Sequence, residues 1–191
     1  MSRSTRLILT YLILLGLSTV LSGGTHAALS GSTGNAGNTF TAGTVVLGDN
    51  DAGTALFNVS NARPGAALSQ CIQTQYTGSL SATVRLYGAM TGALAPYVRL
   101  TMTRGTDPAP TFSGCTTFTA DTTNYVGLGA GVLYDGTLAA YPSSYATGVV
   151  DPLASWTTGQ KASYRFTVEL LDNNAAQGLS MGATFSWEAR S

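Results

Sequence analysis

Strict alternation of apolar and polar residues recurs along this chain, and it restricts the segments that carry it to β-strands. In "SYRFTVELL" (163–171) apolar side chains occupy every second position after the serine, and polar side chains lie between them. "ATFSWEA" (183–189) repeats the pattern. Successive side chains of a strand point to opposite faces of its sheet, whereas apolar positions of a helix recur every three or four residues. Both segments are therefore predicted to be half-buried strands.

Further segments of the same kind are separated by turn residues. Clusters of Gly, Pro, Asn and Asp, such as "ARPGA" at 62–66, mark the turns. Helix is expected only as a short turn near 142–155. About eight short strands predict an all-β fold, an antiparallel β-sandwich of jelly-roll or immunoglobulin-like type. The other six predicted strands are 39–47, 54–60, 70–76, 82–88, 97–103 and 131–138.

Residues 1–27 are predicted to be a signal peptide rather than part of the fold. Arg3 and Arg6 precede the apolar run "LILTYLILLGLSTVL", and the small residues Thr25 and Ala27 suit a cleavage site. The run is short for a membrane span, which needs about 20 apolar residues, and a retained membrane anchor is the alternative. Cleavage leaves seven basic and nine acidic residues, a net charge of −2. This charge offers no footprint for nucleic acid, so we expect a secreted chain without nucleic-acid or membrane partners.

The remaining chain is expected to hold a short flexible segment and one domain. Residues 28–38, "ALSGSTGNAGN", are rich in Gly, Ser and Asn and have almost nothing to bury. We therefore expect this segment to be mobile in a lone subunit. Residues 39–191 have a comfortable size for a single β-sandwich domain, and no composition shift divides them.

Cys71 and Cys115 are the only cysteines of the chain. An even pair in an exported protein predicts a disulfide. Two free thiols acting as ligands or nucleophiles are the alternative. Neither cysteine lies in a C-x-x-C motif, and the only histidine, His26, lies in the predicted signal peptide. We interpret the pair as a disulfide.

Asp49 and Asp51 raise the question of a metal site. Counted as an EF-hand loop from Asp49, Asp51 fits the third position, but Gly53 stands at the fifth and Ser60 at the twelfth. These two positions should carry an oxygen ligand and a bidentate Glu. Asn, Asp and Gly between two predicted strands favour a turn. We interpret the stretch as a turn, with weak Ca²⁺ binding as the alternative.

Ser180 lies in "GLSMG" (178–182), which matches the G-x-S-x-G nucleophile motif. That motif requires a strand–turn–helix and a histidine base, but here a predicted strand follows. A Ser–Lys dyad with Lys161 is the remaining possibility, and nothing in the sequence places the two residues together. "GLGAG" (127–131) lacks the third glycine of a phosphate-binding loop. We therefore predict no catalytic residue, no metal ligand and no cofactor.

Several aromatic residues could form a platform that stacks on sugars. Most aromatic residues of a β-sandwich are instead core residues or cross-strand partners. A glycan-binding surface thus stays an alternative function. The candidates are Tyr87, Tyr97, Tyr125, Tyr134, Tyr141, Tyr145 and Trp156.

Three stretches resemble the TasA/camelysin family of secreted bacterial surface proteins. "NTFTAGTVVL" (38–47), shortly after a signal peptide that ends in Ala, is similar to the start of that family's domain. "NARPGAALSQCIQTQYTGSLSATVRLY" (61–87) resembles its N-x-x-P-G turn, the strand that follows and a T-G-[ST]-L hairpin. "YRFTVELLDNNAAQGLSMGATFSWEA" (164–189) is similar to its closing strand pair.

The resemblance implies a jelly-roll domain that is exported to the cell surface or extracellular biofilm matrix. It also implies a homopolymer, built head to tail, in which the N-terminal segment of one subunit adds as a strand to a sheet of the next. The donor strand would run from Ala28 to about Phe40, with Leu29 and Phe40 as apolar anchors. We expect a non-enzymatic fibre protein, with cell-wall or matrix polysaccharide as a further partner. A camelysin-like secreted metallo-endopeptidase and a monomeric glycan-binding module are the alternatives.

Overall fold

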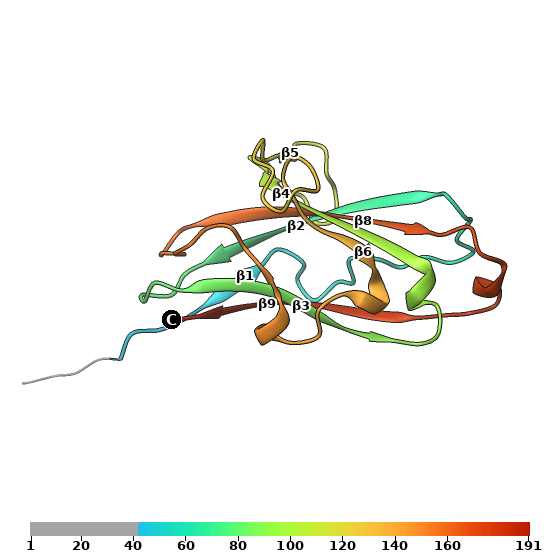
Figure 1. Ribbon diagram of the computed structural model, residues 1–191. Coiled ribbons are helices and arrows are strands. Elements are labelled where there is room, and N and C mark those ends of the chain that lie inside the picture. The colour runs from blue at the N-terminus through green and yellow to red at the C-terminus, as the bar shows by residue number, and fades with distance from the viewer. Residues whose placement is uncertain (1–41) are drawn as a thin grey trace, which may run out of the picture. The chain divides into compact units, whose positions relative to one another are not determined.

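The strands lie where the alternation of the sequence is clearest. The structure is a computed structural model that describes residues 42–191 (Figure 1). The predicted signal peptide, the segment 28–38 and the anchors Leu29 and Phe40 lie outside the described residues. Six predicted strands are confirmed with shifted ends: β2 (Ala67–Tyr76), β3 (Thr83–Thr91), β4 (Val98–Thr106), β6 (Val132–Thr137), β8 (Lys161–Leu170) and β9 (Gly182–Arg190).

Two of the expected strands need correction. The described part of 39–47 enters a strand only at its last residue, where β1 (Leu47–Asp49) begins. The strand predicted at 54–60 is wrong, because this segment is irregular throughout. The neighbours Leu56 and Phe57 are both partly buried against the core, which a strand with alternating faces would not allow.

Short elements complete the chain. The strands β5 (Thr119–Ala120) and β7 (Val149–Val150) are too short to show an alternation of apolar and polar residues in the sequence. Four single-turn 3₁₀ helices connect the strands, and η3 confirms the short turn expected near 142–155. These helices are η1 (Ala95–Tyr97), η2 (Leu138–Ala140), η3 (Tyr145–Thr147) and η4 (Asn174–Ala176).

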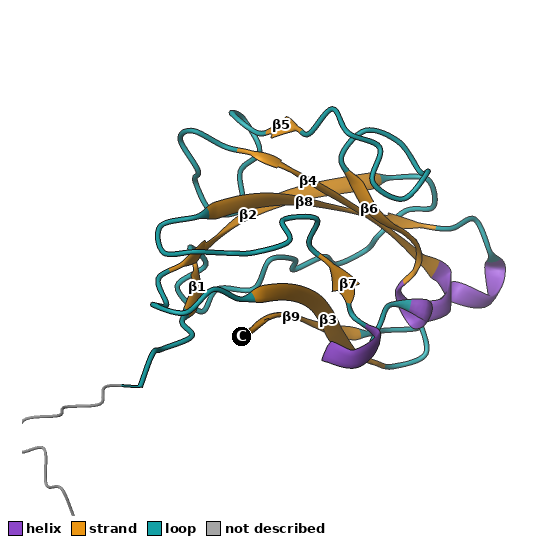
Figure 2. Cartoon of the chain, turned by 60° about the vertical axis from the view of Figure 1, so that its left-hand side comes forward, coloured by secondary structure: helices purple, strands orange, loops and turns teal. Residues whose placement is uncertain are grey.

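The strands form two antiparallel sheets that face each other (Figures 1 and 2). The larger sheet has the order β1-β2-β8-β4-β5, with β6 also paired to β4, and the smaller sheet has the order β7-β3-β9. The long strands change sheet at almost every step, from β2 to β3 to β4 and from β8 to β9. The predicted antiparallel β-sandwich is thereby confirmed.

The core lies between the inward faces of β3, β4, β8 and β9. The ring of Phe166 on β8 is fully buried and lies 4.7 Å from the ring of Phe185 and 5.8 Å from that of Trp187, both on β9. Edge-to-face and tilted contacts of this kind hold the two sheets together beyond the area that they bury. Other fully buried core side chains are Tyr76, Val84, Leu86, Leu100, Met102, Trp156 and Tyr164.

The predicted disulfide between Cys71 and Cys115 is confirmed. It joins β2 to the loop after β4 across a sequence separation of 44 residues. Closing a loop of this length stabilises a fold by about 4 kcal/mol in the chain-entropy account. Cys71 itself is 3% exposed, so the bond is shielded at its β2 end.

Removal of the Phe166 ring should measure how much the inter-sheet core contributes. We expect Phe166→Ala to lower the free energy of unfolding by about 3–5 kcal/mol, because it leaves a cavity among rings that cannot close over it. Val126, whose exposed fraction is 52%, provides the control, and Val126→Ala should change stability by less than about 0.5 kcal/mol. Urea denaturation of both variants checks this. Equal effects would contradict the assigned core.

Candidate functional site: the outer edge of β9

The strand β9 is hydrogen-bonded on one side only within residues 42–191. It pairs with β3 over its full length, Gly182–Arg190. The carbonyl of Val84 on β3 accepts from the N–H of Asp151, and the N–H of Gly88 donates to the carbonyl of Pro142. Both groups point away from β9. The even-numbered residues of β3 therefore face β7, and its odd-numbered residues bond to β9.

The register then fixes which groups of β9 face outward. Tyr87 lies opposite Ser186, so Ser186 belongs to the residues of β9 that bond to β3. The alternate residues direct their N–H and C=O groups to the free edge, where the described residues supply no backbone partner. Three of these residues pack their side chains against the core, namely Phe185, Trp187 and Ala189, and the fourth is Ala183.

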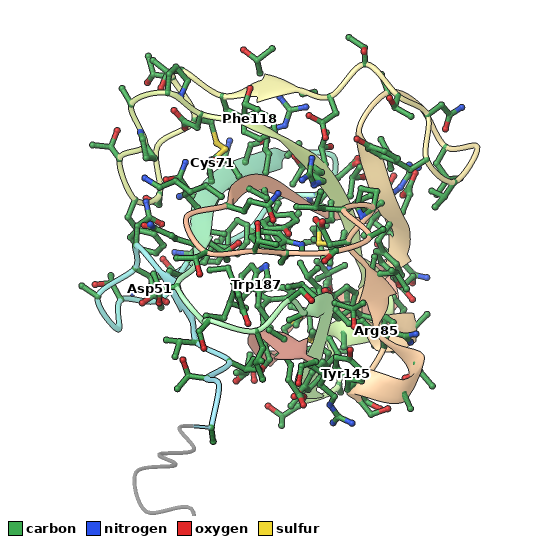
Figure 3. All side chains as sticks on the ribbon, turned by 90° about the vertical axis from the view of Figure 1, so that its left-hand side faces the viewer. Asp51, Cys71, Arg85, Phe118, Tyr145 and Trp187 are labelled. Carbon is green, nitrogen blue, oxygen red and sulfur yellow. A yellow bond between two sulfur atoms is a disulfide. The ribbon has the colours of Figure 1, made fainter. Side chains whose placement is uncertain are left out.

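A cavity of about 240 Å³ adjoins this edge. Leu47, Gly48 and Asp49 of β1, with Thr74 of β2, line it on one side, and the run Phe185–Trp187 of β9 lines it on the other. In Figure 3, Trp187 lies between the layers and Asp51 at the side of the sandwich. The indole Nε1 of Trp187 is buried and has no hydrogen-bond partner among the described residues. A donor left unpaired in this way costs about 1–3 kcal/mol.

The β2 edge of the larger sheet is capped in three different ways. The N–H of Cys71 donates to the carbonyl of Ser113 at 3.0 Å. The N–H of Gln73 donates to Oδ1 of Asn50 at 2.9 Å. Gln75 is paired with Gly48 of β1. Such caps prevent an edge from pairing with another chain.

The other edges are short or irregular. β6 has six residues, and its register with β4 shifts between Met102 and Thr103. β7 and β5 have two residues each. Short strands and irregular register are recognised protections of a sheet edge. Among the edges described, β9 is thus the longest without such protection.

Asp49 and Asp51 form successive turns at the end of β1. The N–H of Asp51 donates to Oδ1 of Asp49 at 3.1 Å, and the N–H of Gly53 donates to Oδ1 of Asp51 at 2.6 Å. Ala52 and Gly53 have positive φ angles of 51° and 78°, as a tight turn requires. Partial burial raises the pKa of Asp49, and the neighbouring Asp51 adds to the rise through its side chain and charge. The stretch turns the chain, as the sequence indicated.

The serine and lysine of the possible dyad lie far apart in the fold. Lys161 opens β8, whereas Ser180 follows the opposite end of that strand and precedes β9. A strand of ten residues spans about 30 Å. The motif around Ser180 leads into a strand and not into a helix, so the nucleophile-elbow geometry is absent there. The glycine-rich stretch 127–131 is a loop.

The seven aromatic candidates do not form one exposed platform. Tyr141 and Trp156 belong to the buried core. Tyr125 donates its hydroxyl to Asp121 at 2.8 Å. Tyr145 stacks against the guanidinium of Arg190, at 4.0 Å from the ring centroid.

A buried polar network around Asp151 is the feature that the sequence reasoning missed. The carboxylate of Asp151, 2% exposed, accepts from Nε of Arg104 at 2.8 Å, from the hydroxyl of Tyr164 at 2.7 Å and from Nε1 of Trp156 at 3.1 Å. Arg104 also donates to Asp121 at 2.6 Å. The stretch "VVDPL", an acid between apolar residues, is the signal that could have revealed it.

The charges of this network support one another. Burial by itself would lower the pKa of Arg104, but the attraction of Asp151 and the hydrogen bonds that Arg104 donates to both acids raise that pKa above its ordinary value. Burial, followed by the charge of Asp151, raises the pKa of Tyr164. Each group here is hydrogen-bonded, so the network holds β4 and β8 to the segment after β7.

Within residues 42–191, no three His, Cys, Asp or Glu side chains come together as a set that could hold a metal ion. None of the helices described in this part of the chain is long and apolar enough to cross a membrane.

The first part of the chain is similar to a known family. Residues 9–90 match the family model described as camelysin metallo-endopeptidase. The chain is therefore similar to this family over less than half of its 191 residues. The match ends within β3, so Cys115, the Asp151 network and β9 lie beyond it. Among curated proteins, none matches the chain.

The Asp151 network should be a large contributor to stability. We expect Asp151→Asn to lower the free energy of unfolding by about 3–5 kcal/mol, because it leaves the Arg104 charge buried with a weakened partner. Asp135→Asn is the matched control. It breaks the exposed pair with Arg99, whose side chain is 50% exposed, and should cost less than about 1 kcal/mol. Thermal and urea unfolding of both variants at pH 7 check this, and a small effect at Asp151 would contradict the assignment.

Proposed function

We propose that this chain is a non-enzymatic structural protein of a bacterial surface or extracellular biofilm matrix. It polymerises head to tail when the N-terminal segment of one subunit adds as a strand to β9 of the next. The observation that carries the proposal is the outer edge of β9, which is long, unprotected and unpaired within the described residues.

Strand addition would satisfy the groups that β9 leaves open. An extended peptide beside β9 can exchange hydrogen bonds with the outward N–H and C=O groups of four residues, each bond contributing about 0.5–1.5 kcal/mol net. An apolar side chain of the incoming strand can enter the cavity between β1 and β9.

Residues 28–40 are the proposed donor, with Leu29 and Phe40 as its apolar anchors. Donor and acceptor are then different surfaces of the same chain. Such a heterologous contact does not close on itself and gives a filament. Matrix or cell-wall polysaccharide is a proposed further partner of the assembled fibre.

Proline in β9 can test the acceptor edge without disturbing the sheet. The N–H groups of Ala183 and Ala189 point outward, so Ala183→Pro with Ala189→Pro removes two edge donors and no hydrogen bond to β3. We expect this variant to fold as a monomer and to form no filaments. The control, Ala183→Ser with Ala189→Ser, keeps both N–H groups and should assemble as the unmodified chain does. Electron microscopy and circular dichroism check both.

Filaments from the folded proline variant, in the same yield as from the serine control, would contradict β9 as the acceptor. An unfolded proline variant would show that the outward direction assigned to these two N–H groups is wrong.

The alternative function is the endopeptidase activity that the family description names. We expect the purified protein not to cleave casein, because the described residues bring no metal-binding set of side chains together. Incubation with and without a chelator checks this expectation. Cleavage that the chelator abolishes would establish the peptidase instead. Retention of monomer on polysaccharide, without filaments, would favour the glycan-binding module.

A further inference from the structure

Cys71 is tied to the same loop twice. Its sulfur is bonded to Cys115, and its backbone N–H donates to the carbonyl of Ser113, two residues earlier in that loop. The second contact is a β-bridge on the outer edge of β2. The disulfide therefore holds the segment that caps this edge of the larger sheet.

The two ends of the loop are held by other contacts. The carbonyl of Asp107 accepts from Nε2 of Gln73 at 3.1 Å. The guanidinium of Arg165 lies 5.1 Å from the ring centroid of Phe118. Between these points the residues 111–115 are held by the disulfide, by the Ser113 hydrogen bond, by a turn in which the N–H of Gly114 donates to the carbonyl of Thr111 at 2.8 Å, and by the partial burial of Phe112. The hydroxyl of Thr117 also donates to Asp107 and to the carbonyl of Ala109 across the loop. The disulfide and the Ser113 hydrogen bond are the contacts that join this part of the loop to Cys71 of β2.

The uncapped part of β2 would form a second open edge. The outward N–H groups of β2 belong to its odd-numbered residues, since Cys71 and Gln73 bond outward while Tyr76 bonds to Gln160 on the β8 side. The outward groups of Ala67 and Ser69 have no backbone partner among the described residues beyond the β2 edge. Release of the cap would extend this free run from Ala67 to Cys71.

We propose that the Cys71–Cys115 disulfide is an edge cap that prevents a second copy of this chain from pairing with β2. Strand addition is then confined to β9, and growth is linear. This inference builds on the proposed fibre function. Without the cap each subunit offers two acceptor edges, and association becomes branched and irregular, as expected for an exposed flat edge.

Hydrogen exchange tests the cap itself in the monomer. In the full chain carrying Cys71→Ala with Cys115→Ala, the amide at position 71 should exchange faster by about an order of magnitude or more. Amides of β2 that bond on the β8 side, such as that of Tyr76 with the carbonyl of Gln160, should change much less. Unchanged exchange at position 71 would overturn the proposal, because Ser113 would then remain in place without the disulfide.

Sedimentation tests the consequence for association. We expect irregular sedimenting material from the double alanine variant and recovery of soluble protein when Ser69→Pro is added, because that change blocks the opened β2 edge. Ser69→Val in the same background keeps the N–H group and should not restore solubility. Val84→Ala with the disulfide intact is destabilised in the core, and it should stay soluble. Two outcomes would overturn the proposal: Ser69→Pro fails to restore solubility, or the Val84→Ala variant sediments. Either outcome would show that the sedimentation of the double alanine variant comes from lost stability and not from an opened edge.

The outcome is separable from that of the fibre hypothesis. Absence of filaments from the unmodified chain would count against the proposed function. The hydrogen-exchange rate of the amide at position 71 and the comparison of the two Ser69 variants would still test the edge cap. Regular filaments from the double alanine variant, indistinguishable from those of the unmodified chain, would overturn the edge cap and leave the fibre hypothesis standing.

Discussion

The unpaired backbone groups at the ends of each sheet are the constraint on which the rest of this structure depends. A sandwich of two open sheets has four edges, and an edge strand presents N–H and C=O groups that will pair with any available strand. This chain shortens β7 and breaks the register of β6. It caps β2 with Ser113, Asn50 and β1. Only β9 keeps a long and regular free edge within the described residues, and the functional proposal follows from that asymmetry.

The buried network around Asp151 explains how a chain with so few charges holds its sheets in place. The 191-residue chain has nine basic and nine acidic residues. One of the acids, Asp151, is nevertheless buried, and its carboxylate accepts hydrogen bonds from Arg104, Tyr164 and Trp156. Such a network fixes a unique arrangement of its partners because each alternative leaves a buried charge unpaired. The remaining surface is polar but weakly charged, and it neither repels nor selects strongly charged partners.

Strand periodicity made most of the fold predictable, and the candidate site much less so. The long strands β8 and β9 are half-buried, so their alternation is visible in the sequence. The pairing of Cys71 with Cys115 was predictable from the number of cysteines and the expected export of the chain. The segment 54–60 was mistaken for a strand because Leu56 and Phe57 bury side chains without regular hydrogen bonds. The free edge of β9 could not be predicted, since a strand's sequence does not state which neighbours it lacks. The donor anchors Leu29 and Phe40 stay predictions.

The most direct test of strand addition compares the chain beginning at Ala28 with the chain beginning at Phe40, by electron microscopy and sedimentation under identical conditions. The account predicts filaments only from the longer chain, because the shorter one keeps the acceptor edge of β9 and lacks the donor strand. Filaments of equal yield from both chains, or monomers from both across pH and salt, would contradict the account.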